Sequence, residues 1–172
     1  MKRTLLILGA GAQQTLLIRR AEQRGIRVVV CDRDPQAPGV SFASEHAQTD
    51  TLDVEAVTSV ARRFNVDGIA SLATDQPITT LAHVTERLGL HQYISPENSL
   101  RATNKEAMKK AFASRGVDTA KCVLVRGDQD LPAAIGELRL PVVVKPADAQ
   151  GQRGTRKIDK PDDIEPAIRE AV

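Results

Sequence analysis

The sequence predicts an α/β protein, in which a parallel sheet covered by helices spans residues 1–94 and a smaller α+β region spans residues 95–172. Three observations support this fold class. Short apolar runs alternate with amphipathic stretches, which is the pattern of strand–helix–strand units. The apolar runs are continuous, as in strands that are buried on both faces. Gly9-Ala10-Gly11 follows the first run, where a strand turns sharply into a helix.

The elements of the first region follow one another clearly. Thr4 to Leu8 is an apolar run, and the helical stretch after it carries apolar residues on one side and ends at Gly25. Residues 27–31 form the second run, so these three elements make a parallel strand–helix–strand unit. The same criteria predict a short strand at residues 46–49, a helix capped by Asp53 that reaches Phe64, a strand at 68–71, and a helix from Pro77 to Leu88.

The second region has more varied signals. Ser95-Pro96 is expected to form a linker-like turn. The last helix stops at Val172 with its apolar stripe unfinished, which favours a fragment of a longer protein or an engineered chain. The elements expected between these two points are a helix that starts at Ser99 or Thr103 and runs to Gly116, a strand near 122–125, a helix over 131–138, an apolar strand over 140–146, a returning strand over 155–158 and a helix from Pro161.

Composition excludes several classes of protein. The 172 residues include no Trp, three Phe and one Tyr, so the core is aliphatic and single-stranded nucleic acid finds few stacking platforms. The formal net charge of +2 provides no global basic field for a polyanion. A membrane-spanning helix needs an apolar run of about 18 residues, and there is none. We therefore expect neither nucleic acid nor a membrane as a partner.

Cysteine and histidine give no sign of redox or metal chemistry. Cys31 and Cys122 fall within predicted strands and lack a CxxC partner, so we expect both to be buried, reduced thiols of a cytoplasmic protein. The three histidines lack metal-ligand spacing, and we expect no metal site from them: His46, His83 and His91.

Charge is concentrated in the second region. Residues 98–157 carry 12 Lys and Arg against 6 Asp and Glu, whereas residues 1–95 carry 10 of each kind. The basic excess surrounds two glycine-bearing loops. It suits a small polyanion such as a nucleotide better than a long one.

The Gly9-Ala10-Gly11 turn brings backbone N–H groups and a helix N-terminus together, a geometry that favours an anion. The dinucleotide fingerprint needs a third glycine three residues later, where this chain has Gln14. Asp32 stands at the end of the second strand, where an acid would bind a ribose hydroxyl. Three interpretations stay open: a tight turn without a ligand, a site for a small carboxylate or phosphate, and a dinucleotide site.

Two lysines are candidates for phosphate binding. Lys105 stands at the start of a predicted helix, where the helix dipole disfavours a cation, so an external anion is its better partner. Lys145 ends an apolar strand that we expect to be buried on both faces, so its charge needs a partner. Gly151 and Gly154 around Arg153 would let a backbone approach phosphate oxygens closely. The alternative is that both lysines are solvated and that an ordinary hairpin loop follows Lys145.

Together these motifs resemble the ATP-grasp superfamily of ligases. They occur in the family's order and spacing: Gly9-Ala10-Gly11, Thr74-Asp75, Ser95-Pro96, Asn104-Lys105 with Met108-Lys109, and Pro141 to Asp148 followed by Gly151 and Gly154. The chain is most similar to the branch of biotin carboxylase, the carboxylate–amine ligases of purine biosynthesis and the large chain of carbamoyl phosphate synthase. The resemblance implies a Rossmann-like pre-ATP-grasp domain over residues 1–94 and the first, incomplete lobe of the ATP-grasp domain over residues 95–172.

The resemblance also implies a reaction and its cofactors. ATP would activate a small-molecule carboxylate as an acyl phosphate, and an amine would then displace phosphate. Mg²⁺ would assist, with ligands that lie outside this chain, so we expect these 172 residues to turn over little ATP alone.

Individual site residues follow from the same resemblance. Those implied to bind the nucleotide are Lys105, Lys145 and a glycine-rich lid that contains Gly151, Arg153 and Gly154. This lid has fewer glycines than that of biotin carboxylase, which leaves the substrate open. Those implied to hold the acceptor substrate are Gly11, Asp32 and Asp75.

Two other functions remain as alternatives. One is a Rossmann-type nucleotide-binding domain without ligase chemistry, which Asp32 favours and Gln14 disfavours. The other is a non-catalytic subunit of a split ligase, which would need a partner chain carrying the missing lobe. Analogy with the family also suggests a homodimer.

Overall fold

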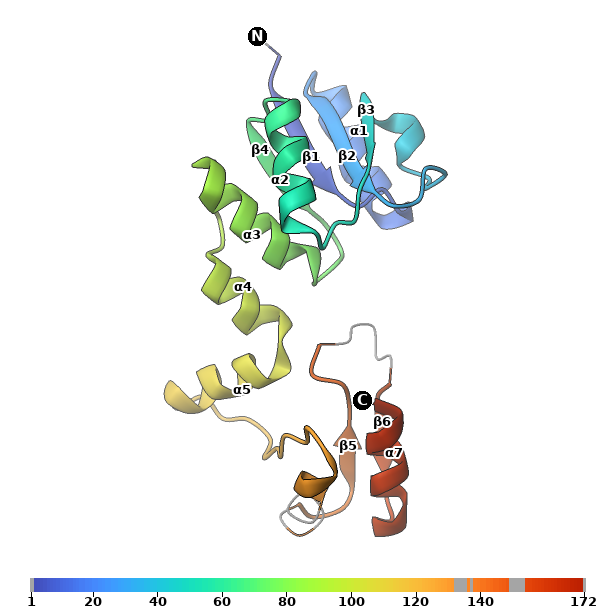
Figure 1. Ribbon diagram of the computed structural model, residues 1–172, viewed down its shortest axis with the longest axis vertical. Helices are drawn as coiled ribbons and strands as arrows, with labels where there is room; N and C mark the ends of the chain where they lie inside the picture. Colours follow the sequence, from blue (N-terminus) through green and yellow to red (C-terminus); the bar gives the residue numbers. More distant parts are fainter. Residues whose placement is uncertain (1, 132–135, 137, 149–153, 172) are drawn as a thin grey trace. The chain divides into compact units, whose positions relative to one another are not determined.

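The computed structural model describes residues 2–131, 136, 138–148 and 154–171. The chain forms two compact units, Met1–Thr103 and Asn104–Val172, which are drawn from blue to red along the sequence in Figure 1. These units are defined by packing. The domain boundary expected after residue 94 remains a prediction.

The first unit is built on a four-stranded parallel sheet in the order β3-β2-β1-β4. In register, Leu6 of β1 lies beside Val29 of β2 and Ile69 of β4. The strand bounds are Thr4–Leu8 for β1, Arg27–Asp32 for β2, Glu45–Gln48 for β3 and Gly68–Ser71 for β4. The predicted α/β class with a parallel sheet is therefore confirmed.

Helices cover both faces of this sheet, which explains why its central strands are continuously apolar (Figure 1). Alternate residues of β1 point to opposite sides. Leu6 and Leu8 belong to a core cluster that includes residues of α2 and α3, whereas Ile7 packs in a second cluster with Ile18 and Ala21 of α1. The helices of the unit are α1 (Ala12–Gln23), η1 (Val40–Phe42), α2 (Val54–Arg63), α3 (Pro77–Leu88) and α4 (Pro96–Thr103).

Local signals fix where several of these helices begin and end. Gly25 lies just past α1 with φ of +77°, a left-handed conformation that glycine adopts without strain, and its N–H donates to the Glu22 carbonyl at 2.8 Å. The Asp53 side chain accepts a hydrogen bond from the Ala56 N–H at 2.9 Å and caps α2 as predicted.

The expected turn at Ser95-Pro96 is wrong, because this pair starts helix α4. The Ser95 hydroxyl accepts a hydrogen bond from the Asn98 N–H at 3.2 Å, so Ser95 acts as an N-cap and Pro96 occupies the first helical position. Two starts were open for the helix that runs to Gly116. Ser99 is wrong, and Thr103 agrees with the structure to within two residues, because Asn104 caps a separate helix by accepting from the Ala107 N–H at 3.0 Å.

The second unit combines helices with a small antiparallel sheet. Strand β5 (Val142–Val144) pairs with β6 (Arg156–Ile158), and Val142 lies beside Ile158. Its core contains Leu131, Ile158 and Ile168. The remaining elements described are α5 (Lys105–Ser114), η2 (Asp128–Asp130), η3 (Pro161–Asp163) and α7 (Ile164–Ala171).

Two expectations for this unit are wrong, and a third cannot be compared. Residues 122–125 form no strand, and Cys122 is exposed, whereas Cys31 is buried as expected. An apolar run becomes a strand only when a neighbouring strand pairs with its backbone, and the sheet described for this unit consists of β5 and β6. The helix expected over residues 131–138 lies mostly outside the described residues.

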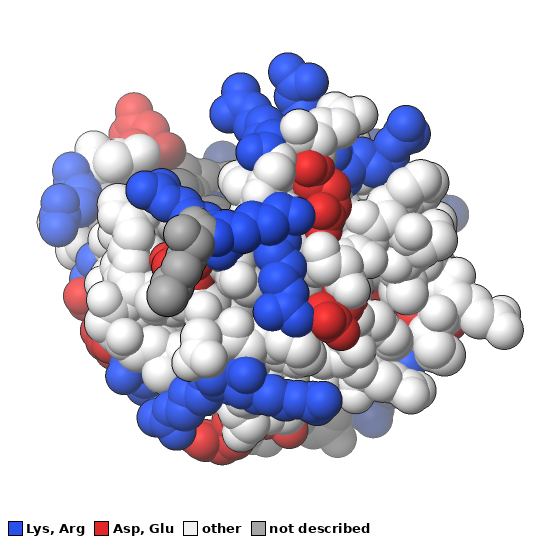
Figure 2. All heavy atoms as spheres, turned by 90° about the horizontal axis from the view of Figure 1, so that it is seen from above, with Lys and Arg blue, Asp and Glu red and all other residues white. Residues whose placement is uncertain are grey.

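Charges on the surface are mixed in sign. Figure 2 shows basic side chains in separate groups with acidic side chains between them. Ion pairs account for some of this arrangement, for example Arg27 with Glu45 at 2.8 Å in the first unit and Arg156 with Glu170 in the second.

Candidate functional site

A small pocket lies at the carboxyl ends of the parallel strands of the first unit. Its volume is about 160 Å³, and its walls are formed by Leu8, Gly9, Gln14, Asp32, Arg33, Thr51, Thr74 and Pro77. The strand order reverses at β1, between β2 and β4. Open α/β sheets bind ligands outside the carboxyl ends of the strands at such a reversal. Segments far apart in the sequence therefore meet at a place suited to a ligand.

Asp32 lies in the wall of this pocket, and its carboxylate holds the surrounding backbone. Oδ2 accepts a hydrogen bond from the Ala10 N–H at 2.7 Å, and Oδ1 accepts one from the Asp34 N–H at 2.9 Å. The Ala10 carbonyl in turn accepts from the Gly39 N–H at 2.6 Å. Asp32 thus ties the Gly9-Ala10-Gly11 turn to the end of β2, a role that its position in the sequence did not reveal.

Gln14 occupies the place of the third glycine in the dinucleotide fingerprint. The side chain is 8% exposed, and its Nε2 donates a hydrogen bond to the Leu72 carbonyl after β4. Its amide carbon lies 3.5 Å from where a Cβ on Gly9 would stand, and its Oε1 lies 3.0 Å from that position on Gly11. A buried side chain therefore covers the turn. This disfavours the dinucleotide interpretation.

The other two residues expected on the acceptor side are placed differently. Gly11 is the N-cap of α1 and presents no side chain of its own. Asp75 is exposed in the loop before α3, next to Thr74, which lines the pocket. Of the three predicted residues, Asp32 alone is among those that line this pocket.

A larger pocket of about 540 Å³ lies in the second unit. Its apolar walls come from β5, α7 and the segment 123–125, and both predicted lysines, Lys105 and Lys145, line it. The N–H of Lys105 donates to the Ala147 carbonyl at 3.0 Å, and its Nζ lies 3.4 Å from the same oxygen. The start of α5 is thereby held against the segment that follows Lys145.

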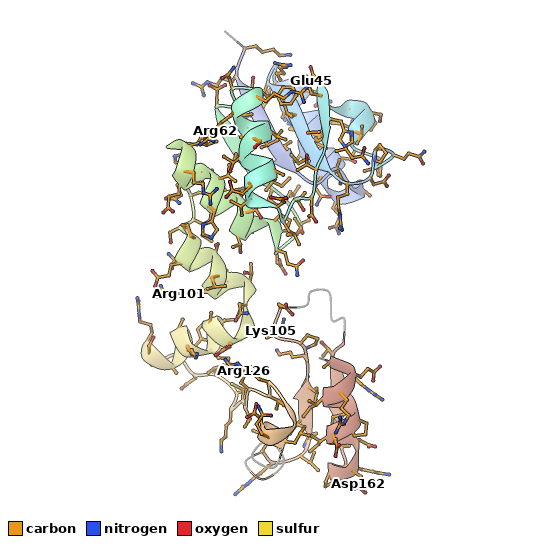
Figure 3. All side chains as sticks on the ribbon, in the orientation of Figure 1. Glu45, Arg62, Arg101, Lys105, Arg126 and Asp162 are labelled. Carbon is orange, nitrogen blue, oxygen red and sulfur yellow. The ribbon has the colours of Figure 1, made fainter. Side chains whose placement is uncertain are left out.

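The basic side chains around this pocket differ in what they contact. Lys110 and Arg126 both donate to Glu106, at 2.6 and 2.8 Å, and the start of α5 and Arg126 are visible in Figure 3. The hydrogen bond from Lys110, together with the contribution of Arg126, lowers the pKa of the Glu106 carboxyl below its ordinary value. Lys109 donates to the Thr119 hydroxyl at 2.6 Å. Within the described residues, the side chain of Lys145 makes no hydrogen bond or ion pair.

The reason given for Lys145 from the sequence needs correction. Strand β5 is not buried on both faces, since Val143 is 58% exposed and its neighbours are half-buried. The two-stranded sheet leaves one side of β5 open, so burial does not force a partner on Lys145. Its candidacy depends instead on its position in the pocket wall.

The glycine-bearing loop after Lys145 is described only at its end. Gly151 and Arg153 lie outside the described residues. Gly154 has φ of +66°, and a Cβ there would stand 2.9 Å from the Pro146 ring. This close approach requires glycine and places the end of the loop against the residue that follows Lys145.

The described part of the chain contains neither a metal-ligand cluster nor a membrane-spanning helix. No group of three or more His, Cys, Asp or Glu side chains there could hold a metal ion. No helix among the same residues is long and apolar enough to cross a membrane.

Comparison of sequences places the chain among known proteins. Residues 5–92 match the family described as PylC-like, N-terminal domain. Formate-dependent phosphoribosylglycinamide formyltransferase from Vibrio vulnificus (strain YJ016) is 27% identical over 168 residues, covering 95% of this chain and 42% of the relative. The enzyme of that name from Burkholderia pseudomallei (strain 668) is 29% identical over 174 residues, covering 98% of this chain and 42% of the relative. The chain thus spans less than half the length of these relatives.

Solved structures share the fold of this chain. Phosphoribosylglycinamide synthetase from Anaerococcus prevotii superposes with a TM-score of 0.70 at 29% identity, covering 99% of this chain and 42% of that one. N5-carboxyaminoimidazole synthetase from Staphylococcus aureus, complexed with ADP, has a TM-score of 0.79 at 20% identity, covering 99% of this chain and 46% of that one. An L-amino acid ligase from Bacillus licheniformis has a TM-score of 0.77 at 21% identity, covering 98% of this chain and 41% of that one.

Proposed function

Because the chain belongs to the family of PylC-like N-terminal domains and the ATP-grasp resemblance is confirmed, we propose that it forms the N-terminal part of an ATP-dependent carboxylate–amine ligase. In the whole enzyme, ATP activates a small-molecule carboxylate as an acyl phosphate, and an amine displaces the phosphate. The protein contributes mainly by positioning the reactants and by stabilising charge.

The arrangement of Lys105 and Lys145 carries this proposal. These residues are far apart in the sequence, yet both line the 540 Å³ pocket of the second unit. Lys145 makes no hydrogen bond or ion pair with the described residues, so its ammonium group is available to an anion. A lysine ammonium is well suited to phosphate, and the apolar walls beside it suit a base or a ribose.

The other nucleotide-binding assignments belong to the same proposal. We assign Gly151, Arg153 and Gly154 to phosphate binding; of the three the structure describes Gly154, which packs closely against Pro146 next to Lys145. Mg²⁺ neutralises charge in phosphoryl transfer. The described residues offer no cluster for it, so we expect its ligands from outside these residues.

The first unit holds the acceptor substrate in this proposal. The 160 Å³ pocket lies beside the N-terminus of α1, which favours an anionic group; Arg33, ion-paired with Asp50, and the Asp32 carboxylate also line it. Gly11 would contribute its backbone and Asp75 its carboxylate from the adjacent loop, whereas Asp32 would shape the turn. We also propose a cytoplasmic location, since Cys31 and Cys122 are both free thiols, and a homodimer by analogy with the family.

The test is ATP binding by the chain itself, measured by isothermal titration calorimetry with Mg²⁺ present. A hydrogen bond to a charged group contributes roughly 1.5–3 kcal/mol, so Lys145→Ala is expected to weaken binding by about 10-fold or more. Lys160→Ala is the matched control, because Lys160 is an exposed lysine of the same unit that does not line the pocket. Equal affinity of the two variants, or no binding of ATP by the unmodified chain, would refute the proposed role.

A further inference from the structure

We propose that Gln14 is a specificity-determining residue, which restricts the pocket of the first unit to a ligand bearing a single phosphate or carboxylate group and excludes a pyrophosphate. The inference rests on the proposed function in treating this pocket as the acceptor site. It goes further by naming the residue that selects the class of ligand.

The Gln14 side chain occupies the space above the turn. In the dinucleotide fingerprint, glycines allow the pyrophosphate to approach the backbone and allow the helix to pack close to the strand. Here the amide carbon and Oε1 of Gln14 lie within 3.5 and 3.7 Å of the Cβ position of Gly9. Oε1 also lies 3.0 Å from the Cβ position of Gly11. The side chain therefore fills the volume that a second phosphate group would need.

A hydrogen bond and burial hold the Gln14 side chain in place. Its Nε2 donates to the carbonyl of Leu72, which directly follows β4, so the side chain joins the first turn of α1 to the loop after β4. The residue is only 8% exposed. Moving the side chain aside would break this partly buried hydrogen bond, which is unfavourable. Gln14 is consequently a fixed wall of the pocket.

The pocket that remains beside Gln14 is small. Pockets that bury a whole cofactor-sized ligand have volumes of roughly 300–1,000 Å³. The pocket beside Gln14 has about 160 Å³ and lies at the N-terminus of α1; Arg33, ion-paired with Asp50 at 3.5 Å, and the Asp32 carboxylate both line it. That volume fits one phosphate or carboxylate group with a short extension, while the remainder of an acceptor would lie outside the pocket.

The test uses the 172-residue chain labelled with ¹⁵N and follows the backbone amide resonances of Gly9, Gly11 and Ala12 during titration. The two probes are inorganic phosphate and inorganic pyrophosphate. The variant is Gln14→Gly, which completes the fingerprint. Gln13→Gly is the matched control, because Gln13 has the same chemistry in the same turn of α1 and is exposed. Shifts of the amide resonances of the turn report binding at the pocket of the first unit, and they distinguish it from binding at the lysines of the second unit.

We expect Gln14→Gly to raise the affinity for pyrophosphate relative to phosphate at least tenfold, and Gln13→Gly to leave this ratio unchanged. An equal ratio in the unmodified chain and in a folded Gln14→Gly variant would overturn the inference. A gain confined to Gln14→Gly, with no phosphate binding by the unmodified chain, would support the role of Gln14 and count against the proposed acceptor site. If none of the three folded proteins binds either probe at the turn, both ideas fail.

Discussion

Replacing Asp32 with Ala tests whether its carboxylate stabilises the fold of the first unit. The substitution removes the acceptors of two backbone N–H groups, those of Ala10 and Asp34. Ala10 is fully buried, so its N–H would lose its partner without gaining water. Asp34 is exposed, and its N–H would be hydrated instead.

The expected loss follows from this difference. A buried donor left without a partner costs about 1–3 kcal/mol, and a hydrogen bond to a charged acceptor contributes at the upper end of that range. The exposed bond to Asp34 adds little. We therefore expect Asp32→Ala to lower the free energy of unfolding of the first unit by about 2–3 kcal/mol. For a unit of this size, this corresponds to a fall in melting temperature of roughly 10–20 °C.

Urea denaturation followed by tyrosine fluorescence measures this loss in the right part of the chain. Tyr93 is the single tyrosine, it lies in the first unit, and the chain has no Trp. Asp34→Ala is the control, because Asp34 makes a similar bond to the Gln36 N–H at 2.8 Å but is exposed. The control should lose less than about 1 kcal/mol. Equal losses in the two variants would refute the structural role assigned to Asp32.

Two further predictions concern a helix cap and the two thiols. Asn104→Ala should destabilise the second unit by about 1 kcal/mol, because it removes the N-cap of α5. Asn104→Ser should retain most of the stability, because serine is also a good N-cap. Urea denaturation followed by circular dichroism measures both losses, and equal losses would contradict the capping role. Burial, with a smaller contribution from the charge of Asp32, raises the pKa of the Cys31 thiol to about 12. Because the folded state holds this proton more tightly than the unfolded chain, the associated stability is present below the ordinary thiol pKa and is lost as the pH rises toward 12. At pH 8 we expect a maleimide to label exposed Cys122 quickly and Cys31 only after unfolding, and equal rates in the native protein would show that Cys31 is accessible.

Much of the first unit could be predicted because its signals are local. The apolar run from Thr4 to Leu8, the glycine after α1 and the cap at Asp53 each act within a few residues, and the corresponding elements appear where they were expected. The second unit was harder to predict, because its strands depend on pairing with residues that are distant in the sequence. Residues 122–125 are apolar enough for a strand, but the described sheet offers no partner for their backbone.

The candidate site was predicted in part. Lys105 at a helix start and Lys145 at a strand end were predicted to bind phosphate. The structure places both lysines in the wall of one pocket. The stated reason for Lys145 was wrong, because β5 is open on one side. Gln14 was recognised only as a departure from a motif, since its hydrogen bond to Leu72 joins residues 58 positions apart.

The sequence by itself determined the fold class, the order of the strands and helices in the first unit, and the family, because periodicity, caps and turn glycines are properties of neighbouring residues. Only the tertiary structure decided that the Asp32 carboxylate holds the backbone of the turn, that Gln14 fills the third glycine's place, and that Lys145 is available beside the larger pocket. Each of these depends on hydrogen-bond partners, burial and open volume. Residues distant in the sequence supply all three.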